Sequence, residues 1–71
     1  MTLTDTQTTY RADNGNYIIF SESSYFETWT IITSDKRGPN KTIKNTYSYK
    51  SVLDATEHMS KLSQALNVNI D

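Results

Sequence analysis

The sequence contains no cysteine, and its 71 residues include one proline, two glycines and one histidine. Without cysteine, the chain has no disulfide bond, no thiolate ligand for zinc or iron–sulfur clusters and no thiol nucleophile. With a single histidine, no pair of imidazoles can bind a metal ion. We therefore expect no cofactor and no metal site. The fold must be stabilised by packing or by a partner.

Long apolar runs are also missing. The longest is the four-residue stretch Tyr17-Ile18-Ile19-Phe20. A membrane-spanning helix needs about 20 apolar residues, and a signal-peptide core needs about seven to fifteen. The sequence therefore predicts no membrane span and no export signal, and we expect a cytoplasmic protein.

What is present is the composition of a small folded domain. Hydrophobic residues make up 35% of the chain, and the aromatic residues are five tyrosines, two phenylalanines and one tryptophan. This is too aromatic, and too poor in glycine and proline, for a disordered chain. A domain of this size buries only about 60% of the surface that its unfolded chain exposes. We expect one domain over residues 1–71, with residues 1–7 as a frayed leader.

Turn signals divide the first 50 residues into strands. The sequence Asp13-Asn14-Gly15-Asn16 predicts a hairpin whose two-residue type I′ loop is Asn14-Gly15. In that register Tyr10 is opposite Ile19. A polar turn over 21–24, a strand over 25–34, a loop over 35–40 and a strand over 41–49 follow. A loop with an even number of residues before the third strand places Trp29 on the face of Ile18. A loop with an odd number would exchange the two faces of the third strand.

The last third of the chain has helical periodicity. Ser51 and Asp54 form a variant of the capping box, with Ser51 as the N-cap. Apolar residues then recur at helical spacing in one stripe: Val52, Ala55, Met59, Leu62 and Leu66. Asn67 is a suitable residue to end the helix, after which Val68 and Ile70 pack back against the core. The predicted fold is α+β: a three- to four-stranded antiparallel β-meander with one C-terminal α-helix packed on one face (β-β-β-β-α).

One helix covers only one face of such a sheet. We expect it to cover the face that carries Ile18, Phe20, Trp29, Ile31, Ile43 and Tyr47. The opposite face then exposes more apolar side chains than a monomer of this size usually leaves in water. These candidate protein-interaction residues are Tyr10, Tyr17, Ile19, Phe26 and Ile32. The leading interpretation is a non-enzymatic interaction domain that forms a homodimer, or binds another protein, through this face.

The charge distribution supports a second hypothesis. The net charge is -1, but residues 36–50 hold five of the seven cations and no acid. An alternative function is therefore nucleic-acid binding by Lys36, Arg37, Lys41 and Lys44. Two observations weigh against it: the negative net charge, and the alternation that turns Lys44 away from Tyr47 and Tyr49. A further alternative is a phage-type or mobile-element-type inhibitor that acts on a larger protein. The amino-acid composition, rich in Asn, Thr, Ile and Lys, suggests this source.

Catalytic residues are not recognisable. Ser51, Asp54 and His58 are the types found in a hydrolase triad, but all three belong to one short helix. There we expect a capping serine and a solvated surface pair rather than a nucleophile and its base. The acids are scattered singly, and no glycine-rich phosphate loop is present. We expect no enzymatic activity and no small-molecule substrate.

Overall fold

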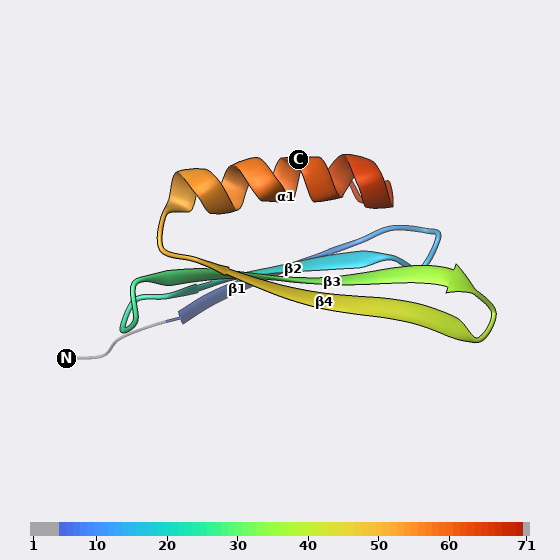
Figure 1. Cartoon of the computed structure of the whole chain (residues 1–71), viewed down its shortest axis with the longest axis horizontal. Coiled ribbons are helices and arrows are strands. Elements are labelled where there is room, and N and C mark those ends of the chain that lie inside the picture. The colour runs from blue at the N-terminus through green and yellow to red at the C-terminus, as the bar shows by residue number, and fades with distance from the viewer. Residues whose placement is uncertain (1–4, 71) are drawn as a thin grey trace.

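The computed structural model describes residues 5–70, which form an antiparallel sheet in the order β1-β2-β3-β4 and one helix (Figure 1). The elements are β1 (Asp5–Arg11), β2 (Tyr17–Ser23), β3 (Thr28–Gly38), β4 (Lys41–Tyr49) and α1 (Val52–Leu66). The helix lies across one face of the sheet, which confirms the predicted α+β meander with a C-terminal helix. β1 begins at Asp5, so residues 5–7 pair with β2 instead of fraying. The rest of the expected leader, residues 1–4, lies outside the described residues.

The loop of the first hairpin differs from the predicted type I′ turn. The Ala12 amide donates to the Asn16 carbonyl (2.9 Å), and the Gly15 amide donates to the Ala12 carbonyl (3.1 Å). The loop therefore has three residues, Asp13 to Gly15. Gly15 has φ 94°, whereas Asn14 does not adopt a positive φ. This is the type I turn with a left-handed glycine that closes three-residue hairpins, and it shifts the strand pairing by one residue.

The shifted register changes the faces of β1. Tyr10 pairs with Ile18, and Arg11 pairs with Tyr17. Because successive side chains of a strand point to opposite faces, Tyr10 shares the face of Ile18, where it packs against the core. Arg11 is then on the other face. The prediction that Tyr10 belongs to the uncovered interaction face is therefore wrong.

The turn between β2 and β3 comprises residues 24–27, three residues later than predicted. It has an even number of residues, so Phe20 pairs with Ile31 and the predicted sharing of faces between these strands is confirmed. Phe26, however, belongs to this turn and is 69% exposed. It is not a residue of the open sheet face, which corrects its predicted placement.

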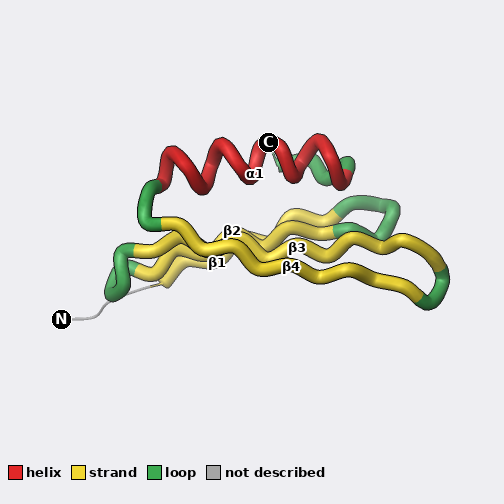
Figure 2. Tube along the Cα trace, in the orientation of Figure 1, coloured by secondary structure: helices red, strands yellow, loops and turns green. Residues whose placement is uncertain are grey.

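The second hairpin is longer than predicted. β3 continues to Gly38 and β4 starts at Lys41, so the predicted loop over 35–40 shrinks to Pro39 and Asn40. Beyond Ser34, the last residue of β3 that pairs with β2, only β3 and β4 are paired. This two-stranded ribbon extends past the helix at the right of Figure 1, as the trace in Figure 2 also shows. Ile43 lies on the ribbon, and this explains why it is 37% exposed although it is on the covered face.

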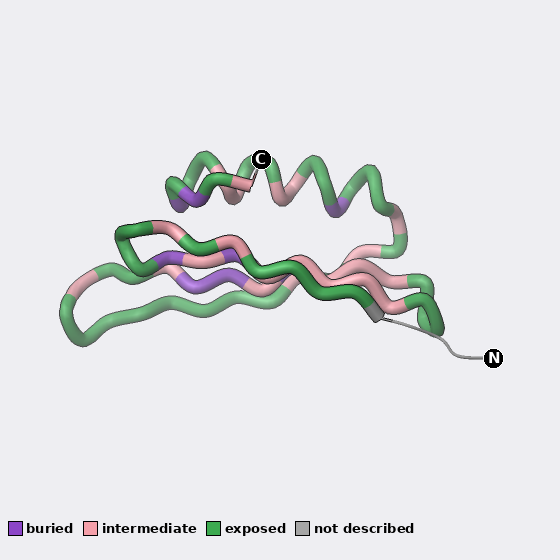
Figure 3. The backbone as a smooth tube through the Cα atoms, turned by 180° about the vertical axis from the view of Figure 1, so that it is seen from behind, coloured by how far each residue is buried: buried purple, intermediate pink, exposed green. Residues whose placement is uncertain are grey.

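The core lies between the helix and the middle of the sheet (Figure 3). Ile18, Ile31 and Val68 are fully buried there, and Leu66 is buried beside them. Partly buried neighbours complete this cluster: Tyr10, Ala12, Phe20, Tyr47, Tyr49, Met59, Leu62 and Ile70. The predicted return of Val68 and Ile70 to the core is confirmed. No helix of residues 5–70 has the length and apolar character needed to cross a membrane.

Both predicted helix ends are confirmed. The Ser51 hydroxyl accepts a hydrogen bond from the Asp54 amide (3.5 Å), as expected for an N-cap. Asn67 adopts a left-handed conformation with φ 57°, and the Val68 amide donates to the Ser63 carbonyl (3.0 Å). This last bond turns the chain back, and the turn carries Val68 into the core.

Candidate functional site

The sheet face opposite the helix, called the open face from here on, carries charge of one sign over strand residues 6–49. Strand residues 6–49 place three charged side chains on it, and all three are cations: Arg11, Lys36 and Lys44. Most of the remaining positions are hydroxyl or amide residues: Gln7, Thr9, Ser21, Ser23, Thr28, Thr30, Ser34, Thr42, Thr46 and Ser48. The open face is therefore polar and cationic rather than mainly apolar.

Two of the cations stand in one row across the sheet. Arg11 pairs with Tyr17, Tyr17 pairs with Ser34, and Ser34 pairs with Lys44. Adjacent strands are about 4.8 Å apart, so the backbones of Arg11 and Lys44 are about 14 Å apart. The Arg11 guanidinium lies over the Tyr17 ring, 5.6 Å from its centroid. We call this set, Arg11, Tyr17, Ser34 and Lys44, the cationic row.

The third cation, Lys36, lies two residues beyond the row on the projecting ribbon. Its backbone amide donates to the side-chain oxygen of Asn16 (2.7 Å), and the side-chain nitrogen of Asn16 donates to the Leu66 carbonyl (3.0 Å). Asn16 is only 7% exposed. This buried amide therefore fixes the base of the ribbon to the first hairpin loop and to the C-terminus of the helix.

The acids of residues 6–70 lie elsewhere. Asp54 and Glu57 are on the exposed side of the helix, and Glu22 and Glu27 are at or beside the β2–β3 turn. Asp13 is in the first hairpin loop, which Asn14 links to the Leu66 carbonyl on the helix side. The small net charge of the chain therefore hides a separation of charge between the two faces.

The predicted interaction residues are divided among three places. Tyr17, Ile19 and Ile32 lie on the open face, all partly buried. Tyr10 is in the core cluster, and Phe26 is in the β2–β3 turn. Ile19 and Ile32 pair with each other, and Thr9 and Thr46 flank them. The apolar part of the open face is thus a pair of isoleucines and a tyrosine beside the cationic row.

The predicted nucleic-acid residues are closer together. Lys36 and Lys44 are on the open face, and Lys41 follows the ribbon turn. Arg37 is at the same tip and pairs with Asp35 (Nε to Oδ2, 2.6 Å). Sequence reasoning missed Arg11, because the two-residue loop assigned it to the covered face. A signal in the sequence could have found it: Tyr10 is more hydrophobic than Arg11, so a register that buries Tyr10 and exposes Arg11 is favoured.

The triad-like residues do not form a catalytic arrangement. Ser51 caps the helix, whereas the Nδ1 atom of His58 hydrogen bonds with the hydroxyl of Tyr49. The imidazole packs edge-on against Tyr47 and Tyr49, with centroid distances of 4.6 and 5.7 Å. His58 is half-buried against β4 and not solvated as predicted. Within residues 5–70, no three His, Cys, Asp or Glu residues gather as a metal site.

Comparison with known proteins adds no family. No family model matches the chain, and no curated protein or solved structure matches it.

Proposed function

We propose that the protein binds single-stranded nucleic acid along its open face. The observation that carries this proposal is that every charged side chain of strand residues 6–49 on that face is a cation. Arg11, Lys36 and Lys44 would contact backbone phosphates, which supply most of the affinity in sequence-independent binding. Neighbouring threonine and serine hydroxyls are also common phosphate ligands.

The stacking groups on this face favour a single strand. A base can stack on an aromatic or guanidinium group of a sheet only when it is not paired inside a duplex. Tyr17 and Arg11 provide one such platform at the β1 end of the cationic row. Tyr47 and Tyr49 face the helix, as the alternation predicts, and take no part.

Symmetric association of two open faces is less well supported. It would bring together two faces on which the charged side chains of residues 6–49, Arg11, Lys36 and Lys44 in each copy, all have the same sign. Like charges that face each other across an interface cost several kcal/mol. Only three of the five predicted interaction residues remain on the face to offset that cost. We therefore favour a polyanion as its ligand.

The test is fluorescence anisotropy with a labelled mixed-sequence single-stranded DNA of about 20 nucleotides. Three phosphate contacts to a single strand predict a slope of about -2 in log K against log salt, or about a twentyfold loss of affinity between 50 and 200 mM. Each of R11A, K36A and K44A should weaken binding and lower the slope by about 0.7.

The matched control is Lys61→Ala. Lys61 is exposed on the helix, away from the open face, and its ion pair with Glu57 spans 3.9 Å. This substitution removes the same charge and should leave binding unchanged, because a surface pair of this kind contributes little to stability. Binding that ignores salt, or that falls equally in K61A and K44A, refutes the proposal. A duplex of the same sequence that binds more tightly refutes the preference for single strands.

A further inference from the structure

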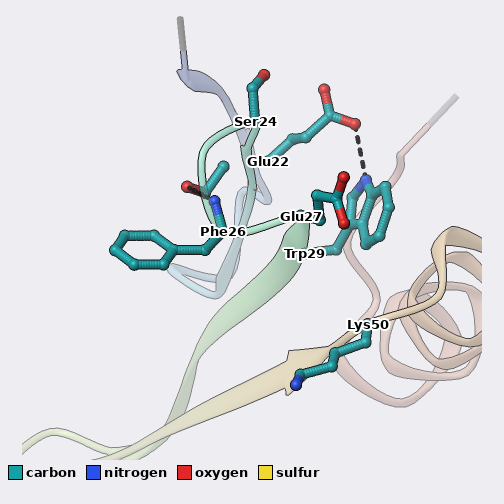
Figure 4. Close-up of a pocket in the computed structure, with 7 residues that line it drawn as sticks. Glu22, Ser24, Phe26, Glu27, Trp29 and Lys50 are labelled. Carbon is teal, nitrogen blue, oxygen red and sulfur yellow. Dashed lines mark hydrogen bonds between the residues drawn. The ribbon is translucent and has the colours of Figure 1, made fainter. Parts of the chain in front are cut away.

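The end of the molecule opposite the ribbon carries a pocket of about 430 Å³ at the β2–β3 turn (Figure 4). Phe26 and Trp29 contribute aromatic rings to its lining, and Glu22 and Glu27 contribute carboxylates. The Trp29 indole N–H donates to one oxygen of Glu22 (2.8 Å), so that ring and that carboxylate are held together. In Figure 4 the Glu27 carboxylate lies beside the same indole ring.

The two carboxylates lack a cationic partner within the described chain. Its ion pairs are Arg37 with Asp35 and Lys61 with Glu57. Lys50 lines the pocket, but its ammonium group points away from both carboxylates (Figure 4). An aromatic ring beside a carboxylate is the combination that binds a guanidinium or ammonium group, through cation–π and charge-assisted hydrogen bonds. The chemistry of the pocket therefore selects a cationic side chain.

The chain itself carries that ligand at its other end. The ribbon tip holds Arg37 and Lys41, both exposed, next to the Pro39-Asn40 turn. The molecule is elongated, 45 Å long against 21 and 19 Å across, with the ribbon tip at one end and the β2–β3 turn at the other (Figure 1). A narrow basic tip and an acidic, aromatic pocket are thus complementary surfaces on opposite ends of one chain.

We infer that the protein associates head to tail, with the ribbon tip of one copy in the β2–β3 pocket of the next. Arg37 or Lys41 of one copy then lies against Trp29 and between Glu22 and Glu27 of its neighbour. Such an interface joins two different surfaces, so a pair of copies still has one free tip and one free pocket, and the assembly extends into rows. Association does not use Arg11, Lys36 or Lys44, so this inference does not rest on nucleic-acid binding.

Sedimentation velocity of the full chain, from 10 to 500 µM protein in 50 mM salt, tests the inference. Wild type should form species larger than dimers as concentration rises, and 300 mM salt should reverse this. The pocket variant E22Q/E27Q and the tip variant R37A/K41A should each weaken association by roughly tenfold or more, because each leaves one side of the charge pairing empty. All four substituted residues except Glu22 are exposed, and circular dichroism checks that both variants fold.

Mixing the two variants gives the decisive measurement. The tip variant has an intact pocket and the pocket variant has an intact tip, so an equimolar mixture should form dimers and stop there. E57Q/K61A, which removes two charges from the helix, should behave as wild type. A wild-type monomer at every concentration, a symmetric dimer that neither variant disrupts, or a mixture that does not dimerise overturns the inference.

Discussion

Replacement of Asn16 by alanine tests the feature that sets the position of the ribbon. The Asn16 side chain accepts from the Lys36 amide (2.7 Å) and donates to the Leu66 carbonyl (3.0 Å). It joins three segments that are distant in sequence: the first hairpin loop, the base of the ribbon and the end of the helix. The side chain is 7% exposed, so water cannot readily replace it.

The magnitude follows from the groups left behind. A buried donor or acceptor that loses its partner costs about 1–3 kcal/mol. In N16A the Lys36 amide loses this acceptor, whereas the Leu66 carbonyl keeps the weaker bond from Asn14 (3.3 Å). We therefore expect a loss of about 3 kcal/mol in the free energy of unfolding. In a domain of this size each kcal/mol lowers Tm by about 4–8 °C, so Tm should fall by roughly 15 °C.

Urea denaturation, followed by circular dichroism and by the fluorescence of Trp29, provides the measurement. Asn14→Ala should cost about 1 kcal/mol, because Asn14 is exposed and its bonds to Asn16 and Leu66 are partly accessible to solvent. Asn45→Ala, at an exposed position of β4, should change stability by less than about 0.5 kcal/mol. A value for N16A within about 0.5 kcal/mol of wild type would show that this amide does not hold the three segments together.

Two further pairs of substitutions test the packing and the helix. Ile31→Ala should cost about 3–4 kcal/mol in the same urea titration, because Ile31 is fully buried under the helix. Ile32→Ala, on the open face, should cost about 1 kcal/mol. Equal costs would mean that the helix does not cover the assigned face. Ser51→Ala should cost about 1 kcal/mol through loss of the N-cap, whereas Ser51→Asp should retain most of the stability. Thermal unfolding measures both, and an unchanged Tm in S51A would contradict the capping role.

The elements that the sequence predicted well depend on local signals. The N-cap at Ser51, the apolar stripe of the helix from Ala55 to Leu66 and the left-handed Asn67 all lie within one segment. Val52, the first residue of the predicted stripe, is instead 45% exposed. Each of the confirmed features depends on residues at most four positions apart, where spacing alone identifies the contact. The same holds for the alternation in β4, which placed Tyr47 and Tyr49 on the covered face.

The features that the sequence predicted poorly depend on where the loops begin and end. Phe26 is in a turn and not on a strand because β2 extends through Ser21 to Ser23, a polar segment that only pairing with β1 and β3 keeps extended. Likewise β3 continues through Asp35 and Lys36 because β4 supplies their partners, Ile43 and Thr42. Pairing between strands thus overrides local turn preferences. The sequence of one strand segment does not reveal this, because the partner strands supply the stabilising hydrogen bonds.

The parity of the first hairpin loop has the largest consequence for function. A two-residue loop would place Arg11 opposite Ile18, under the helix, and Tyr10 on the open face. Burying a guanidinium there without a carboxylate partner would cost several kcal/mol, whereas burying Tyr10 contributes to the core. The three-residue loop avoids this cost, since Gly15 supplies its single left-handed residue. The energy that selects this loop therefore also places Arg11 beside Tyr17 and in line with Lys44. Packing on the covered face and the charge of the open face are two results of one choice of register.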